Sequence, residues 1–322
     1  MSVPAAYIGV IIIWSTTPIA VKWSGEGPGF LLAVSARMLI GTLLCIALLK
    51  LLRRPMPWNR QARRAYLATT PAIYGAMMCT YWGAQFIPSG LIAVLYGMSP
   101  LVTGIMASLW LHERSFTPLK LLGMLAGLLG LAVIYKTALT LGPSSAYGIV
   151  AILAAVTLQV ASAVLIKRSG TRMPALTLTT GGLMLALPMY FLTWIVFGPS
   201  LPHAVPLKAA LSILYLGAFG SVAGFVMYYY ILSHLDTGRI ALITLITPVT
   251  ALLLGHTLNA ERIGPEVLMG VILILFGLVL HQWQELRRRG RRDPGPAVHD
   301  TISIKTIPIK PADAPAQNNE AG

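Results

Sequence analysis

Residues 99–114 read SPLVTGIMASLWLHER, and about 148 positions later residues 247–262 read TPVTALLLGHTLNAER. Each stretch contains a proline that lies inside a long apolar run, and each closes the run with Glu-Arg. A proline inside a helix removes one backbone N–H from the hydrogen-bond ladder and bends the helix. The same interruption, at the same distance from the same charged ending, indicates that the chain contains two copies of one unit.

The composition indicates a membrane protein. Of the 322 residues, 56% are hydrophobic and 11% are charged, and the mean hydropathy is +0.74, whereas a soluble domain carries about 25% charged residues. The net charge of +14 does not point to a nucleic-acid partner, because membrane proteins collect Lys and Arg on their cytoplasmic side. The two cysteines, Cys45 and Cys79, lie inside apolar runs and indicate neither a disulfide framework nor a metal site.

Ten apolar segments follow one another, and each is long enough to cross a hydrocarbon core of about 30 Å as a helix. They are residues 4–21, 30–49, 66–87, 90–111, 119–135, 147–166, 174–197, 209–232, 240–258 and 265–283. The first has no basic segment before it, so we interpret it as a span and not as a signal peptide. The predicted fold class is an all-α integral membrane protein with ten transmembrane helices.

The loop charges predict how these spans are oriented. With a cytoplasmic N-terminus, nineteen Lys and Arg residues fall in the loops and tail on the inside and four on the outside, as the positive-inside rule requires. The four outer ones are Lys22, Lys136, Lys208 and Arg262. We therefore expect both termini in the cytoplasm and the protein in the inner, or plasma, membrane.

Matching glycines, prolines and charges define the repeat. The matched pairs include Gly90 and Gly238, Pro100 and Pro248, and Glu113 and Glu261. Five spans is an odd number, so the second copy is inserted upside down, and such inverted five-helix repeats are typical of secondary transporters with a substrate site near the midplane. We predict a first repeat over residues 1–137, a second over residues 138–286, and a basic, disordered cytoplasmic tail over residues 287–322.

The two matched prolines lie near the middle of their spans. Each frees the carbonyl four residues earlier, and a hydroxyl residue directly precedes each proline. The residues concerned are Tyr96, Ser99 and Pro100 in the first repeat and Thr244, Thr247 and Pro248 in the second. We expect the two prolines to act as hinges and the other four residues to contact substrate. The alternative, that the prolines only kink the helices for packing, stays open.

These features resemble those of a known family. Ten spans in two inverted halves, the early IIIWSTTPIA of residues 11–20, Arg37 in the second span and the Pro-to-Glu-Arg pattern are similar to EamA-type exporters of the drug/metabolite transporter superfamily. The resemblance covers about residues 4–283. It implies two packed five-helix repeats and export of amino acids, other metabolites or drugs.

The chain departs from the family pattern in two places. The first span carries Trp14-Ser15 where Trp-Gly is common, and the seventh span has Gly182 or Leu183, depending on the alignment, in place of a counterpart of Arg37. The resemblance is therefore informative about fold and class and carries little information about the substrate.

Polar side chains inside spans are costly in lipid and are therefore candidates for function. Arg37 lies about eight residues into the second span, where no acidic residue of any span lies at its depth. It must pair with carbonyls, water or an anionic group of the substrate, and a structural role is equally open. Tyr81 and Gln85 lie one turn apart and are expected to face one side. The remaining candidates for substrate contact are Trp14, Gln159 and Tyr229.

The favoured function is a secondary exporter of small amphipathic metabolites that works by alternating access. We expect a small-molecule substrate and membrane lipid as partners, no cofactor and no metal, and leave open whether two chains form a homodimer. An intramembrane enzyme would need paired acids, a Ser–His pair or a zinc motif, and we find none. A flippase for lipids or lipid-linked sugars remains an alternative. The coupling ion is open as well: His256 could titrate, but packing is the commoner role of such a residue.

Two glycine-rich stretches have a packing interpretation. The segments GMLAGLLG, residues 123–130, and GSVAG, residues 220–224, contain a GxxxG spacing. This spacing allows two helices to approach closely. We predict a structural role for both.

Overall fold

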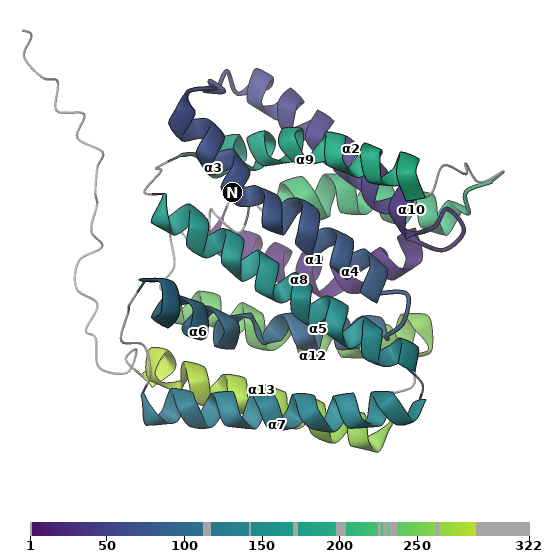
Figure 1. Ribbon diagram of the computed structural model, residues 1–322, viewed down its shortest axis with the longest axis vertical. Helices are drawn as coiled ribbons and strands as arrows, with labels where there is room; N and C mark the ends of the chain where they lie inside the picture. The colour runs from purple at the N-terminus through teal and green to yellow at the C-terminus, as the bar shows by residue number, and fades with distance from the viewer. Residues whose placement is uncertain are drawn as a thin grey trace, which may run out of the picture.

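The computed structural model describes residues 2–111, 117–141, 143–169, 173–197, 204–224, 227, 231, 237–261 and 264–287. Within them every regular element is a helix, and the helices lie roughly side by side in one bundle (Figure 1). The elements are α1 Val3–Ser24, α2 Phe30–Leu51, α3 Arg60–Thr70, η1 Pro71–Ala76, α4 Met77–Gly83, α5 Ser89–Gly97, α6 Ser99–Leu111, α7 Pro118–Leu141, α8 Pro143–Arg168, α9 Ala175–Phe197, α10 Leu207–Tyr215, η2 Leu216–Ala223, α12 Thr237–Asn259 and α13 Pro265–Arg287.

In their described parts the ten expected spans coincide with helix, which confirms the all-α membrane fold. Among the described residues, six helices are long and apolar enough to cross a membrane, and three shorter apolar helices accompany them. The fourth span is divided into α5 and α6, and the third contains a π-helical segment, η1, between α3 and α4. The predicted tail lies outside the described residues, except for its first position.

Helices α7 and α13 form one edge of the bundle, where Figure 1 shows them side by side. A Cβ on Gly123 would lie 2.5 Å from the Gly277 carbonyl oxygen, and one on Gly130 would lie 2.5 Å from that of Gly270. The repeat alignment pairs Gly123 with Gly270 and Gly130 with Gly277. Each contact is therefore the image of the other under exchange of the two halves, as inverted repeats require.

The same exchange relates the other helix pairs. The second and seventh spans, α2 and α9, pack on one another, and so do α5 of the fourth span and α12, the ninth span. The first span of each half packs on the third span of the other half, so that α1 lies on α10 and η2 while α8 lies on η1 and α4. The core therefore sits between the two halves, and neither half buries it alone.

Two π-helical segments, η1 and η2, occupy corresponding places in the third and eighth spans. The alignment that pairs the two matched prolines places η1 on residues 219–224, within or next to η2. A π segment leaves carbonyls without their usual i+4 donor. The Tyr190 hydroxyl donates to the Ile73 and Tyr74 carbonyls in η1, and the Ser221 hydroxyl donates to the Leu216 carbonyl at 3.1 Å in η2. No pattern in the sequence predicts these segments.

The α7–α13 crossing predicts a steric test of the predicted packing role of residues 123–130. Leucine at Gly123 would collide with backbone atoms of α13, so Gly123→Leu should cost about 1–3 kcal/mol or more, although leucine is the better helix former. We expect a fall of several degrees in the melting temperature of the detergent-purified protein. Ala132→Leu, which adds similar bulk on the exposed face of α7, is the control. Equal shifts for the two variants would contradict the crossing.

Candidate functional site

Arg37 lies inside the bundle, about 12 Å along α2 from the start of that helix. It is 5% exposed. Its Nε donates to the Ser221 hydroxyl at 3.3 Å, its Nη1 donates to the Tyr81 hydroxyl at 3.5 Å, and its guanidinium carbon lies 5.9 Å from the centroid of the Tyr81 ring. Because Ser221 belongs to η2, the contact joins the two repeats inside the bundle.

Glycine makes room for this contact. A Cβ on Gly220 would lie 3.3 Å from Nη2 of Arg37, and one on Gly41 would lie 3.1 Å from Cβ of Ser221. The stretch GSVAG therefore does more than bring two helices together, because it also accommodates a guanidinium group. The sequence analysis predicted only the packing role.

Tyr96 extends the polar contacts toward the fourth span. Its hydroxyl lies 2.6 Å from the Thr80 hydroxyl, which itself donates to the Ala76 carbonyl at 2.7 Å. Because a threonine hydroxyl has one proton, Tyr96 is the donor to Thr80. Thr80 and Tyr81 are neighbours on α4, so one set of contacts runs from η2 through α2 and α4 to α5. We call Arg37, Thr80, Tyr81, Tyr96 and Ser221 the Arg37 cluster.

The two prolines have different consequences. At Pro100 the helix breaks, because α5 ends at Gly97 and α6 begins at Ser99. The carbonyl of Tyr96 is not free as predicted, since the Ser99 hydroxyl donates to it at 2.5 Å. Ser99 therefore replaces the missing N–H of the proline.

Pro248, in contrast, lies within the continuous helix α12, so the two spans do not share one hinge geometry. Thr247 is partly buried, and its carbonyl accepts a hydrogen bond from the Thr250 hydroxyl at 3.1 Å. The Thr250 hydroxyl also contacts that of Ser15 on α1. The side chain of Thr244 and the whole of Tyr229 lie outside the described residues, so the repeat mates of Tyr96 and Tyr81 are not placed.

The structure separates Tyr81 from Gln85. Tyr81 is 1% exposed, whereas Gln85 is exposed and its side-chain amide donates to the Trp82 carbonyl at 3.2 Å. The prediction that both face one side is wrong, because the helix ends at Gly83 and the chain turns before Gln85. The one-turn spacing no longer applies beyond that point.

Gln159 faces the interior of the bundle. Tyr147, Val150 and Leu165 form an exposed stripe on α8 that is suited to lipid contact. Gln159 follows Val150 by nine residues, which places it on about the opposite side of the helix. It is nevertheless exposed, so the inner face of α8 borders open space at this level.

Trp14 is partly buried on α1 and packs against a small apolar group that includes Val10 and Ile243. Its indole nitrogen lies 3.7 Å from where a Cβ of Gly224 would stand. It therefore lies beside the end of η2, close along the chain to Ser221, and its predicted substrate contact stays a prediction.

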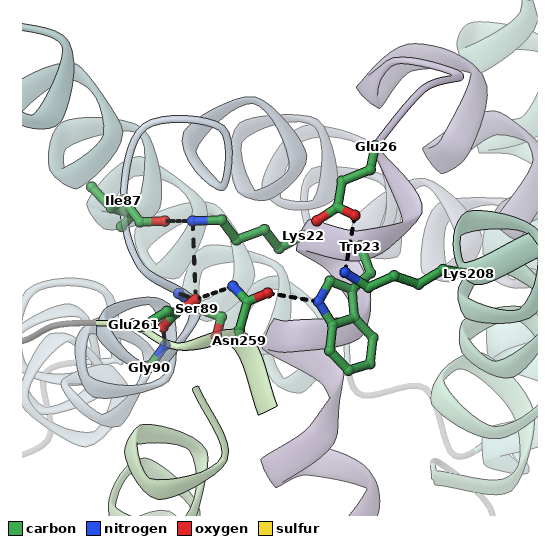
Figure 2. A network of polar contacts seen from close by, with 9 residues as sticks. All are labelled: Lys22, Trp23, Glu26, Ile87, Ser89, Gly90, Lys208, Asn259 and Glu261. Carbon is green, nitrogen blue, oxygen red and sulfur yellow. Dashed lines mark hydrogen bonds and ion pairs between the residues drawn. The ribbon is translucent and has the colours of Figure 1, made fainter. Parts of the chain in front are cut away.

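A second polar network closes one end of the bundle, where α1 ends, α5 begins and α12 ends (Figure 2). The Glu261 carboxylate accepts hydrogen bonds from the backbone N–H groups of Ser89 at 2.9 Å and Gly90 at 3.2 Å, and from the Asn259 amide at 2.8 Å. Lys22 stands 4.0 Å from the same carboxylate. Glu261 therefore caps a helix and also pairs with a cation of the other repeat.

The partners of Glu261 determine its charge. Burial raises the pKa of its carboxyl, but the hydrogen bonds from the Ser89 and Gly90 amides and from Asn259 outweigh burial and hold the pKa below its ordinary value. The group is therefore a carboxylate at neutral pH. Its repeat mate, Glu113, lies outside the described residues.

Comparison with known proteins identifies the class. The sequence profile of the EamA-like transporter family matches residues 3–136 and again residues 146–281. The chain belongs to the EamA-like transporter family. It is therefore a multi-pass membrane transporter built from two repeats of one unit, and the sequence resemblance to this family is confirmed.

Individual relatives agree with the family. The uncharacterized transporter YoaV of Bacillus subtilis is 24% identical over 88% of this chain and 97% of its own length. A probable terminal-alkyne amino-acid exporter of Streptantibioticus cattleyicolor is 25% identical over 90% and 97%, and the uncharacterized inner membrane transporter YedA of Escherichia coli K12 is 25% identical over 85% and 89%. One solved crystal structure, 20% identical, matches the fold with a TM-score of 0.60 over 88% of this chain and 98% of that one.

The Arg37 cluster includes two residues that sequence reasoning missed. Thr80 is adjacent to a predicted site residue, and Ser221 was assigned to a packing motif. A serine inside an apolar glycine-rich span was the available signal for Ser221. Among the described residues, no group of three or more His, Cys, Asp or Glu side chains is placed to hold a metal ion.

The contact between Tyr96 and Thr80 predicts energetic coupling. Tyr96→Phe should destabilise the protein by about 1 kcal/mol, because it removes one buried hydrogen bond, and Thr80→Val should destabilise it more, because it also removes the bond to the Ala76 carbonyl. The double variant should cost less than the sum, with a coupling energy of about 0.5–1.5 kcal/mol. Thermal unfolding of the four proteins in one detergent measures the cycle. Additive effects would show that the two hydroxyls do not interact.

Proposed function

We propose that this transporter exports small amphipathic metabolites that carry a carboxylate, amino acids among them, by alternating access. The observation that carries the proposal is Arg37, a cation at mid-membrane depth held by neutral hydroxyls from both repeats. A site between inverted repeats at this depth is where such transporters bind substrate.

The charge of Arg37 calls for an anionic partner. In the described part of the chain the ion pairs are Lys22 with Glu261 and Lys208 with Glu26, and neither involves Arg37. A buried guanidinium without a counter-ion is costly. A substrate carboxylate would supply that counter-ion through charge-assisted, two-pronged hydrogen bonds. The ring of Tyr96, which is only partly buried, offers contact surface for an apolar or aromatic substrate body.

The relatives support this substrate class. One of them is named a probable terminal-alkyne amino-acid exporter, and every amino acid carries a carboxylate. Its name also supports export over uptake.

Gln159 is exposed although it lies on the side of α8 opposite the stripe suited to lipid contact. This open space supports entry of substrate from the end of the bundle at which α8 ends. At the opposite end α5 packs on α12, while α6 packs mainly on α8. With the orientation that the loop charges favour, the open end faces the cytoplasm. An exporter binds its substrate from that side.

One observation favours the flippase as a second candidate. A groove of about 340 Å³ runs between α1 and α10. Its walls are mainly apolar, with Trp23 and Lys208 at one end, the latter 4.5 Å from the Trp23 ring centroid. A groove of this kind suits an acyl chain below a charged head group.

The carboxylate hypothesis predicts discrimination between an amino acid and its amide. Cells that express the protein and are preloaded with labelled pairs of both should release the acid faster than the amide. Arg37→Ala should reduce efflux of the acid at least tenfold and remove the preference, because the anion loses its partner. Arg37→Lys should keep part of the activity, since lysine retains the charge and loses the fork geometry.

The matched control is Lys50→Ala, which removes an exposed cation from the same helix. Variants are compared at equal abundance. Equal efflux of acid and amide by the wild type would contradict carboxylate recognition. The cells could release neither the acid nor the amide of any labelled pair. If a fluorescent phospholipid then crosses the bilayer faster in reconstituted vesicles than in protein-free vesicles, the flippase is the better function.

The predicted orientation has its own test. An alkaline phosphatase fused after residue 287 should be inactive, because both termini are expected in the cytoplasm. The same enzyme inserted in the loop at Gly27 should be active, since that loop lies at the end expected to face outward. The reverse pattern would invert the assignment of inside and outside.

A further inference from the structure

The N-terminus of α5 is capped from the other repeat. A helix leaves its first N–H groups without partners, and Pro88, which precedes α5, provides no side-chain cap. The Glu261 carboxylate takes the N–H groups of Ser89 and Gly90 instead. An anion at this place also interacts favourably with the helix dipole. The cap of a first-repeat helix is therefore a residue of the second repeat.

The backbone around Glu261 is built to aim its side chain at α5. Ala260 has φ of +49°, a turn conformation that non-glycine residues seldom adopt. The Glu261 N–H then donates to the Gly255 carbonyl at 3.1 Å, which folds the chain back against α12. Glu261 is consequently 8% exposed. A strained turn followed by a buried carboxylate indicates a position that the surrounding structure fixes.

Glycines on both helices permit the close approach. A Cβ on Gly255 would stand 2.5 Å from Oε2 of Glu261 and 3.1 Å from the Ser89 hydroxyl oxygen. A Cβ on Gly90 would stand 2.9 Å from Cα of Leu252. Helices α5 and α12 are therefore in backbone contact beneath the carboxylate, and no path for a solute passes between them at this point.

The end of α1 is tied into the same network (Figure 2). Lys22 donates to the Ile87 carbonyl at 3.0 Å and faces the Glu261 carboxylate, and the Trp23 indole N–H donates to the Asn259 side chain at 2.9 Å. Asn259 in turn donates to Glu261. One carboxylate thus connects three spans from the two repeats.

We propose that Glu261 is a latch: its carboxylate holds this end of the transporter shut while the substrate site is open to the other end. The inference rests on the alternating access of the proposed function. Release of Ser89 and Gly90 lets α5 separate from α12, and the break at Met98 gives α5 a joint about which to move. Because Tyr96 lies on α5, the same movement separates Tyr96 from Thr80 within the Arg37 cluster. Glu261 is a positioning residue in this scheme, since it acts on substrate only through α5.

The latch is a fixed charge and not a proton switch at physiological pH. Charged and titratable groups at this end of the bundle come from four elements. They are Lys22 and Glu26 on or just after α1, Lys208 on α10, His256 on α12 and Glu266 on α13. Arg262 follows Glu261 in the chain and lies outside the described residues. Because the latched state lowers the pKa of Glu261, the latch is fully formed above the ordinary pKa of a glutamate and is lost as the pH falls through the lowered value.

Two cysteine reporters test the latch without any substrate. In a background of Cys45→Ala and Cys79→Ser, Ala93→Cys reports on the closed end, because position 93 lies one turn after Gly90 on the face toward α12 and is 7% exposed. Gln159→Cys reports on the open inner face of α8. Each is labelled with a membrane-impermeant maleimide in right-side-out and in inverted vesicles.

Glu261→Gln should raise the labelling rate of the α5 reporter from the latched side by roughly tenfold, which corresponds to about 1.4 kcal/mol. The same change should lower the labelling of the α8 reporter from the opposite side. Glu261→Asp should give an intermediate shift, because it keeps the charge and shortens the reach. Lowering the pH from 8 to 6 slows maleimide labelling of any thiol, because the thiolate is the nucleophile, so in the wild type both rates should fall together and their ratio should not change.

Glu26→Gln is the matched control, since Glu26 is the exposed acid at the same end and pairs with Lys208. If Glu26→Gln has the same effect, the loss of any negative charge explains it and the latch is overturned. If both reporters label faster in Glu261→Gln, the residue only stabilises the fold and the proposal is overturned. Unchanged labelling rates for both reporters overturn it as well. Labelling does not depend on export, so the latch is tested even if the efflux experiment shows no transport of the proposed substrates.

Discussion

A chain in hydrocarbon must satisfy every backbone N–H and C=O from within, because no water is present to do so. At several places in the described residues where this bundle departs from continuous α-helix, a side chain supplies the missing partner. The Ser99 hydroxyl donates to the carbonyl freed at Pro100, the Tyr190 hydroxyl donates to a carbonyl of η1, and the Ser221 hydroxyl donates to a carbonyl of η2. At the end of the bundle the Glu261 carboxylate accepts hydrogen bonds from the first N–H groups of α5. Irregular backbone and buried polar side chains therefore occur together.

This coincidence explains why the candidate site lies where it does. Ser221 donates its proton to the carbonyl of Leu216 and is then left with lone pairs that accept the Arg37 N–H. Thr80 behaves in the same way, since it donates to Ala76 and accepts from Tyr96. Each hydroxyl donates to a backbone carbonyl, and its oxygen accepts a hydrogen bond from a side chain in the interior. The polar cluster is thus a consequence of how the spans are interrupted, and it needs no buried acid.

The sequence predicts the parts of this structure that depend on regular helix. Hydropathy located the spans, and the matched prolines and Glu-Arg endings located the repeat, because both follow from periodic or covalent properties of the chain. It failed where a local departure decides the outcome. Gln85 turns outward because α4 has ended, and the Tyr96 carbonyl is occupied because Ser99 lies within reach. The π segments depend on tertiary partners such as Tyr190, which no local pattern reveals.

The two halves are alike in backbone and unlike at the site, and the difference has a chemical meaning. Where the first repeat carries Arg37, the second has Gly182 or Leu183, and a Cβ on Gly182 would overlap the Thr69 hydroxyl, so no cation fits there. In the proposed alternating access the two repeats exchange roles, but the charge of Arg37 belongs to the first repeat alone. A substrate with one anionic end and one apolar end matches such a site, whereas a symmetric dianion would leave its second charge in an apolar environment.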